Sequence, residues 1–193
     1  MNEYQHKEPA TKSRGSLFSN LERGTENFIL RFRALFKPNL IAKDIYQIDF
    51  EKLKNQGIDS LLVDIDDTLI PRGVIDISPQ VFEWIVARKE EGFKLCLTSN
   101  SYHPLKVKYF GETLGVPAVS LGFKPFPFAF RRSLKALNSR PENTAMIGDQ
   151  LFMDILGANL QGIFTIYVKY MTPEGFFLRQ WMRMAEEWIL KRI

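Results

Sequence analysis

Cysteine and histidine are scarce in this chain. Among 193 residues there is one cysteine, Cys96, and there are two histidines, His6 and His103. A single cysteine excludes an intrachain disulfide framework and a cysteine zinc site, and it fits a reducing compartment. Two histidines put a multi-histidine metal site out of reach, and a histidine-based catalytic triad would have to use His103.

Long apolar runs are also missing. No stretch approaches the roughly 20 apolar residues that a membrane-spanning helix needs, and residues 1–20 are polar, without an apolar signal core. The hydrophobic fraction of 45% and the charged fraction of 25% are those of an ordinary soluble protein, and the length suits one well-packed domain. We therefore expect a cytoplasmic protein.

The net charge of +4 is unevenly distributed. Lys and Arg exceed Asp and Glu in residues 1–40 and 168–193, whereas the region between them is close to neutral. A neutral core argues against a nucleic-acid surface, so we expect no nucleic-acid partner. The basic ends are instead candidates for peripheral contact with the inner face of an anionic membrane.

Strand and helix patterns alternate along the middle of the chain. Helical patterns cover residues 50–56, 79 to about 92, 104–114, 128–137 and 154–159, and apolar strand patterns cover 61–65, 93–98, 116–120, 145–147 and 163–168. This alternation predicts an α/β, three-layer Rossmann-like fold with a mostly parallel sheet and helices on both faces. Ligands of such folds bind beyond the carboxyl ends of the strands.

The chain divides into four predicted regions. Residues 1–26 are rich in polar residues and are expected to be disordered. Residues 27–57 form a basic amphipathic segment and a lead-in helix, 58–170 form the core of the fold, and 171–193 form a C-terminal amphipathic helix.

Three carboxylates follow the first strand of the core. Asp64, Asp66 and Asp67 come directly after the apolar run from Leu61 to Val63. On a strand, Asp64 and Asp66 would point to the same side and repel each other unless a cation lay between them. A hard, oxygen-seeking ion, Mg²⁺, explains the pair. The alternative is an Asp-rich turn after an edge strand.

Polar residues follow the other predicted strands as well. Each signal has an ordinary structural explanation, as a turn, a solvated lysine or a helix N-cap. Together, and in chain order, they supply a nucleophile, hydroxyl donors, an ammonium and metal-binding acids, which are the groups that phosphoryl transfer needs. The residues concerned are Asp64, Asp66, Asp67, Thr68, Thr98, Ser99, Asn100, Lys124, Asp149 and Asp154.

In this order the motifs resemble those of the haloacid dehalogenase (HAD) superfamily, over about Asp64 to Asp154. The resemblance implies that Asp64 attacks phosphorus to form an aspartyl-phosphate, and that Asp66 protonates the leaving oxygen and then activates water. It also implies that Ser99, Asn100, Thr68 and Lys124 bind the phosphoryl group.

The resemblance further implies Mg²⁺ held by Asp64, the backbone carbonyl of Asp66, Asp149 and Asp154. Either Thr98 or Ser99 could be the hydroxyl of the second motif. We choose Ser99 because it directly precedes Asn100, as in the common Thr/Ser-Asn pattern of the superfamily.

Only short insertions separate the motifs, so we expect no large cap domain. An open site suits a large substrate such as a protein, a nucleic acid or a lipid head group. The motifs around Asp149 most resemble the capless subclass IIIA, YqeG type, a branch that includes phosphatidylglycerophosphate phosphatases. This implies hydrolysis of phosphatidylglycerophosphate, an anionic phospholipid, at a membrane surface.

The chain ends are compatible with a lipid substrate. Residues 176–193 and 27–37 combine aromatic stripes with Arg and Lys, a pattern typical of helices that lie at membrane surfaces. The alternative is that both segments pack on the sheet. Other functions remain open: a capless phosphatase of a soluble phosphoester, phosphoprotein or nucleic-acid end, a receiver-like phospho-switch, or a catalytically silent scaffold.

Overall fold

The computed structural model describes residues 32–120, 123–172 and 177–192, and the segment 1–26 that was predicted to be disordered lies outside them. The chain divides into two units, Met1–Ala34 and Leu35–Ile193. All the elements named below belong to the second unit. Of the predicted amphipathic segment 27–37, residues 32–37 are described, and residues 32–36 are helical.

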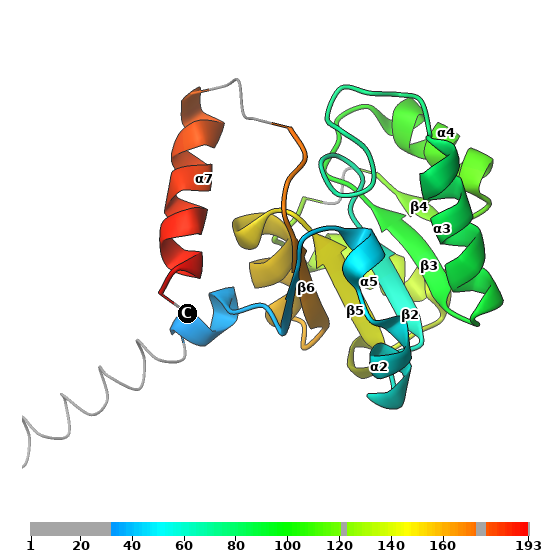
Figure 1. Ribbon diagram of the computed structural model, residues 1–193, viewed down its shortest axis with the longest axis horizontal. Coiled ribbons are helices and arrows are strands. Elements are labelled where there is room, and N and C mark those ends of the chain that lie inside the picture. Colours follow the sequence, from blue (N-terminus) through cyan, green and yellow to red (C-terminus); the bar gives the residue numbers. More distant parts are fainter. Residues whose placement is uncertain (1–31, 121–122, 173–176, 193) are drawn as a thin grey trace, which may run out of the picture. The chain divides into compact units, whose positions relative to one another are not determined.

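A parallel six-stranded sheet forms the centre of the second unit, in the order β1-β6-β5-β2-β3-β4 (Figure 1). The strands are β1 (Leu40–Ala42), β2 (Ser60–Val63), β3 (Lys94–Thr98), β4 (Ala118–Val119), β5 (Thr144–Gly148) and β6 (Phe164–Val168). β2 pairs with β3 on one side and β5 on the other. This order confirms the predicted parallel α/β fold.

Helices connect the strands and cover both faces of the sheet. The α-helices are α2 (Phe50–Asn55), α3 (Pro79–Glu90), α4 (Pro104–Leu114), α5 (Pro127–Leu137), α6 (Leu156–Asn159) and α7 (Phe177–Leu190). Three short turns complete the fold: η1 (Ile45–Gln47), η2 (Pro141–Asn143) and the π-helical η3 (Leu151–Ile155).

The core has two layers, because alternate strand residues face opposite sides of the sheet. Leu61 and Val63 of β2 join the cluster that contains Trp84 of α3 and Phe110 of α4. Leu62 joins the cluster that contains Phe130 of α5. With the sheet buried on both faces, every residue of β2 is buried, as expected for a central parallel strand.

Local sequence signals place the helix ends where the patterns predict them. The Ser78 side chain accepts a hydrogen bond from the Val81 N–H (3.3 Å), which caps α3 ahead of Pro79. Gly115 ends α4 in the left-handed conformation (φ 61°). The two helices are therefore set by their caps as well as by their apolar faces.

Some elements differ from the sequence-based expectation. β1 was not predicted, because three residues at a sheet edge are too few to show a pattern. The strand predicted at 61–65 ends at Val63, so Asp64 and Asp66 lie beyond it and strict alternation does not apply to them.

Within the described residues no cap domain interrupts the core. Residues 71–77 form an irregular connection, and α4 and β4 account for most of the segment after β3. None of the described helices is both long enough and apolar enough to cross a membrane.

Candidate active site

The polar groups that follow the central strands lie at one edge of the sheet. Asp64 follows β2, Ser99 and Asn100 follow β3, and Asp149 follows β5. This is the edge at which parallel α/β folds bind ligands. Asp64, Asp149 and Asp154 are all buried, although carboxylates are rarely buried without a compensating partner.

Asp64 has one carboxylate oxygen held and the other open. Its N–H donates to the carbonyl of Ile147 (2.9 Å), which fixes the residue just beyond β2. Oδ1 accepts a hydrogen bond from Lys124 Nζ (2.6 Å). Oδ2 is buried and has no hydrogen-bond partner among the described residues. Such an oxygen is costly to bury unless it serves a ligand or a reaction.

Three carboxylates crowd together here. Asp64, Asp149 and Asp154 each offer an oxygen, and these oxygens lie within 4.8 Å of one another. Burial raises the pKa of the Asp64 carboxyl to about 7; Lys124 opposes this rise and Asp154 adds to it. Burial also raises the pKa of Asp149 well above its usual value, and Asp64 and Asp154 raise it further.

A hard cation fits this cluster. Burial disfavours the charged form of these carboxylates, and Asp64 Oδ2 has no hydrogen-bond partner among the described residues. An ion that prefers oxygen ligands would stabilise their charged form. The donor set is all oxygen, which suits Mg²⁺ better than a soft metal. The predicted metal residues Asp64, Asp149 and Asp154 therefore fit such an ion.

Lys124 links two of the acids. Its ammonium donates to Asp64 Oδ1 (2.6 Å), to Asp154 Oδ1 (2.5 Å) and to the carbonyl of Thr98 (2.9 Å). Burial alone would lower the pKa of Lys124, but Asp154 and Asp64 outweigh it and hold the pKa above its usual value. Lys124 is therefore charged and fixed beside Asp64, where a phosphoryl group would need a cation.

Asn100 holds the backbone of Lys124. The Lys124 N–H donates to Asn100 Oδ1 (2.7 Å), and Asn100 Nδ2 donates to the Lys124 carbonyl (3.0 Å). These two bonds join the loop after β3 to the lysine loop. They give Asn100 a positioning role, while its predicted contact with phosphate stays a prediction.

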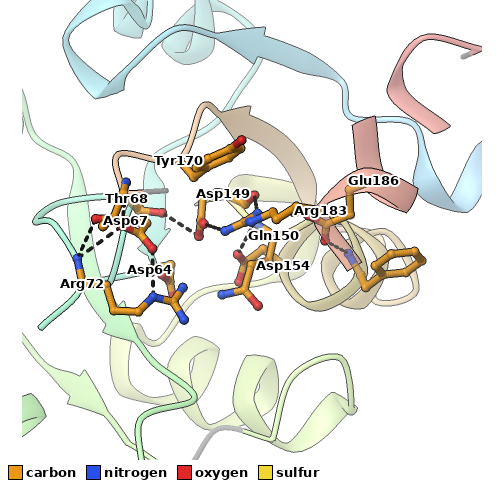
Figure 2. Close-up of polar contacts among 12 residues, drawn as sticks. Asp64, Asp67, Thr68, Arg72, Asp149, Gln150, Asp154, Tyr170, Arg183 and Glu186 are labelled. Carbon is orange, nitrogen blue, oxygen red and sulfur yellow. Dashed lines mark hydrogen bonds and ion pairs between the residues drawn. The ribbon is translucent and has the colours of Figure 1, made fainter. Parts of the chain in front are cut away.

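Gly148 makes room for Asp154. A Cβ on Gly148 would lie 2.4 Å from the Asp154 carboxyl carbon, so no larger residue fits. The wide π-helical turn η3 brings Asp154 back over the end of β5, and Gln150 N–H donates to its Oδ2 (3.0 Å; Figure 2). π-Helical turns occur frequently at functional sites.

The structure separates the two hydroxyls of the second motif. Thr98 Oγ1 forms a hydrogen bond with Ser133 Oγ of α5 (2.7 Å), and both side chains are buried. Ser99 Oγ accepts from the Ser101 N–H (3.0 Å) beyond the strand end, and its own O–H can donate to a ligand. This geometry favours Ser99, the residue that we chose from the sequence.

Asp66 lies apart from the three clustered acids. Its carboxylate forms an ion pair with Lys106 of α4 (2.8 Å) and is partly exposed. A cation between the side chains of Asp64 and Asp66 stays a prediction, and Asp66 lies beyond the end of β2 and outside the acidic cluster. A partly exposed carboxylate beside the site suits proton exchange with water better than metal binding. No sequence pattern predicted Lys106 as the partner of Asp66.

Thr68 and Asp67 support the site from the same loop. Thr68 Oγ1 donates to Asp149 Oδ1 (3.4 Å). Asp67 is buried in the left-handed conformation (φ 67°) and accepts from Arg72 Nε (2.9 Å) and the Thr172 N–H (3.1 Å; Figure 2). Asp67 therefore stabilises the loop, and Thr68 orients the carboxylate of Asp149.

Arg183 of α7 is a site residue that sequence reasoning missed. Its guanidinium donates to both the carbonyl and Oδ2 of Asp149, and to Glu186 Oε2 (3.0 Å; Figure 2). Arg183 and Glu186 are buried. Arg183 is far from the motifs in sequence and belongs to no recognisable pattern. The only weak signal was that Arg183 and Glu186 form an i, i+3 pair of opposite charges among apolar residues.

Comparisons with known proteins identify the family of the chain. A family described as HAD-hydrolase-like matches residues 123–174. The chain is 33% identical over 161 residues to probable phosphatase YqeG of Bacillus subtilis, covering 83% of this chain and 93% of that protein.

A more distant relative is the chloroplastic phosphatidylglycerophosphate phosphatase 1 of Chlamydomonas reinhardtii. It is 28% identical over 170 residues, covering 82% of this chain and 63% of that protein. A solved HAD-like hydrolase, SP0104 of Streptococcus pneumoniae, aligns with a TM-score of 0.48 at 14% identity, over 68% of this chain and 91% of that one. Because the Bacillus relative is matched over nearly its whole length, the chain belongs to the haloacid dehalogenase superfamily, as a phosphatase of the YqeG type.

Proposed function

We propose that this phosphatase removes the terminal phosphate of phosphatidylglycerophosphate at a membrane surface, in a Mg²⁺-dependent reaction through an aspartyl-phosphate. The observation that carries the chemistry is the Asp64 carboxylate, with Oδ1 bound to Lys124 and Oδ2 buried without a partner among the described residues. That oxygen has a lone pair available and is held rigidly, as an attacking nucleophile must be.

The reaction has two steps, the transfer of the phosphoryl group to Asp64 and its hydrolysis. Asp64 Oδ2 forms a bond to phosphorus while the ester P–O bond breaks, and Asp66 gives its proton to the departing alcohol oxygen. Asp66 then takes a proton from a water whose oxygen attacks phosphorus, and the Asp64–phosphate bond breaks to release phosphate. Asp66 is partly exposed, so water can reach it in the second step.

Charge stabilisation comes from Lys124 and Ser99. The Lys124 ammonium lies on Asp64, and the Ser99 hydroxyl follows β3 at the same edge, so both can bind the equatorial phosphoryl oxygens. Mg²⁺ held by Asp64, Asp149, Asp154 and the carbonyl of Asp66 would neutralise part of the charge of the transferring group.

Three observations support a lipid substrate. The described core has no cap domain over the site, so a head group attached to a membrane can enter. A relative that matches most of this chain is named as a phosphatidylglycerophosphate phosphatase. Helix α7 exposes Trp181, Met184 and Trp188 at helical spacing, with exposed Lys191 and Arg192 beside them, as helices at anionic membrane surfaces do.

The test uses phosphate release from phosphatidylglycerophosphate in mixed micelles with Mg²⁺, against soluble phosphomonoesters at equal concentration. We expect a higher kcat/KM for the lipid. Turnover of soluble esters without turnover of the lipid would instead assign a soluble substrate.

The nucleophile has its own test. Asp64→Asn should lower kcat by at least about 10³-fold, with an unchanged circular dichroism spectrum, because amide and carboxylate have the same shape. Asp76→Asn, an exposed residue with the same charge change, is the control. Near-normal turnover in Asp64→Asn would refute the assignment.

A further inference from the structure

The loop that carries Lys124 exposes an unusual amount of aromatic surface. Phe123, Phe126 and Phe128 are 56%, 61% and 63% exposed. Together with Arg132 they line a hollow of about 600 Å³, within the size range of small-molecule sites. Single exposed apolar residues are ordinary, whereas a contiguous cluster marks a binding surface.

Two residues of the same loop, Phe123 and Phe126, are locally unfavourable at their positions. Phe126 is the N-cap of α5 and makes no side-chain capping bond, at a position where Ser, Thr, Asp or Asn is preferred. Phe123 adopts a left-handed backbone (φ 51°), which is unfavourable for a bulky side chain. Residues that are locally unfavourable without a gain in packing are typical of functional sites.

The hollow is connected to the phosphoryl site along the chain, through Lys124. Phe123 and Phe126 flank Lys124-Pro125, and the lysine ammonium is bonded to Asp64 and Asp154. The Asn100 bonds fix the lysine backbone. A Cβ on Gly157 would lie 2.9 Å from Pro125 Cα, so α6 packs tightly against the loop. The Phe side chains are therefore presented on a rigid support.

We propose that Phe123, Phe126, Phe128 and Arg132 form a subsite for the leaving alcohol of the substrate, with its apolar lipid part on the three rings and its phosphodiester at Arg132. This rests on the proposed function and specifies how the lipid is recognised. The lining combines apolar rings with one cation, which complements a molecule that is apolar and carries one internal negative charge.

The test variant is the double substitution Phe126→Ser and Phe128→Ser. Serine is a preferred N-cap residue, and both positions lie at the exposed start of α5, so the change removes two rings without weakening the helix. Neither residue belongs to the catalytic group. Phe82→Ser, at a 46% exposed phenylalanine on α3, is the matched control.

The first measurement uses linear alkyl phosphates of increasing length, below their micelle concentrations. For the wild type and Phe82→Ser we expect kcat/KM to rise about twofold per methylene, roughly half of the free energy of complete burial. For the double variant we expect no rise, with unchanged kcat/KM for the shortest ester. Absence of a chain-length effect in the wild type, or an equal effect in the double variant, would overturn the subsite.

The second measurement uses phosphatidylglycerophosphate in mixed micelles. Here we expect the double variant to raise KM about tenfold. We also expect the KM of Arg132→Gln to be about three times the KM of Arg131→Gln, a neighbouring substitution that removes the same charge. Equal effects of the two arginine variants would refute the phosphodiester contact.

Different results would refute the lipid substrate and the apolar subsite. A wild type that shows the chain-length effect on alkyl phosphates yet leaves phosphatidylglycerophosphate intact would refute the lipid substrate and retain an apolar subsite. A wild type that hydrolyses the lipid with a KM that the double variant does not change would retain the function and refute the subsite.

Discussion

Arg183 illustrates how a residue far from the motifs can control the site. It donates to the backbone carbonyl and a carboxylate oxygen of Asp149, while Thr68 donates to the other carboxylate oxygen. Its guanidinium also lies over the ring of Tyr170, 4.6 Å from the ring centre. These hydrogen bonds therefore hold the carboxylate of Asp149 in one orientation, and such orienting contacts raise the affinity of a carboxylate for a metal ion.

We expect Arg183→Met to raise the Mg²⁺ concentration for half-maximal activity by about 10- to 100-fold. Without the guanidinium, Asp149 loses its orientation and Glu186 loses its partner. Arg183→Lys should recover part of the affinity, because it retains the charge without the two-pronged geometry. A Mg²⁺ titration of phosphatase activity measures the effect, with the exposed Lys191→Met as control.

Loss of a buried ion-pair partner can also cost about 3–5 kcal/mol of stability, so thermal unfolding is recorded on each variant. Arg183 would be merely structural if folded Arg183→Lys lost activity without any change in its Mg²⁺ dependence.

The second motif offers a test at adjacent positions. Ser99→Ala should lower kcat by about 10²- to 10³-fold, the usual effect of removing a donor to the transition state. Thr98→Val should instead leave Ser133 without its partner and lower the unfolding free energy by about 1–3 kcal/mol, with kcat within a few-fold of the wild type. Steady-state kinetics and urea unfolding of both variants check this, and the reverse pattern would assign the motif to Thr98.

The site residues that are best predicted from the sequence are those that follow the end of a strand. Asp64, Ser99, Lys124 and Asp149 lie at the predicted edge because a parallel sheet gathers its carboxyl ends there. Lys106 and Arg183 could not be predicted, because each reaches the site from a helix face on which lysine and arginine are ordinary surface residues.

At the scale of elements, α7 has two different faces. Arg183 and Glu186 face inward, where Glu186 accepts a hydrogen bond from the Phe152 N–H (3.2 Å) of η3, and Ile189 packs beside Phe36 and Leu151. Trp181, Met184 and Trp188 are exposed on the other side. The two alternatives from the sequence, packing on the core and contact with a membrane, are therefore compatible in one helix.

We expect the double variant Met184→Ser and Trp188→Ser to weaken binding to vesicles containing anionic phospholipid by about tenfold, because it removes apolar surface that would enter the interface. Activity on a soluble ester should not change, since neither side chain contacts the site residues. Vesicle co-sedimentation measures binding, and Tyr46→Ser, a 50% exposed tyrosine on η1, is the control. Undiminished binding of the double variant would refute a docking role for this face.

Helices and strands were predicted correctly where a capping residue and a long apolar pattern indicated the same bounds. They were missed where the sequence has neither signal. α3 and α4 have both signals, and their ends were found almost to the residue. β1 has three residues, and η3 is a π-helical turn where the pattern suggested an ordinary helix start at Asp154. The reason is physical: η3 is shaped by its contact with Lys124, which is distant in sequence, as well as by the space above Gly148.

At the scale of the whole molecule, a cation bound by the acidic cluster would couple metal binding to folding. Asp64 follows β2, whereas Asp149 and Asp154 both follow β5, so the three carboxylates meet only in the folded chain. Burial and mutual repulsion raise the pKa values of Asp64 and Asp149, so the fold holds charges that disfavour one another. A cation that binds the folded chain alone must therefore stabilise it.

We expect saturating Mg²⁺ to raise the melting temperature of the metal-free protein by roughly 5–10 °C, because a ligand at 100 times its Kd adds about 2.7 kcal/mol and each kcal/mol is worth about 2–4 °C in a chain of this size. Asp149→Asn should lose most of this response, whereas Asp76→Asn should retain it. Scanning calorimetry with and without Mg²⁺ measures the shift independently of turnover. An equal shift in Asp149→Asn would mean that the ion binds elsewhere on the chain and that the three buried acids serve the reaction without it.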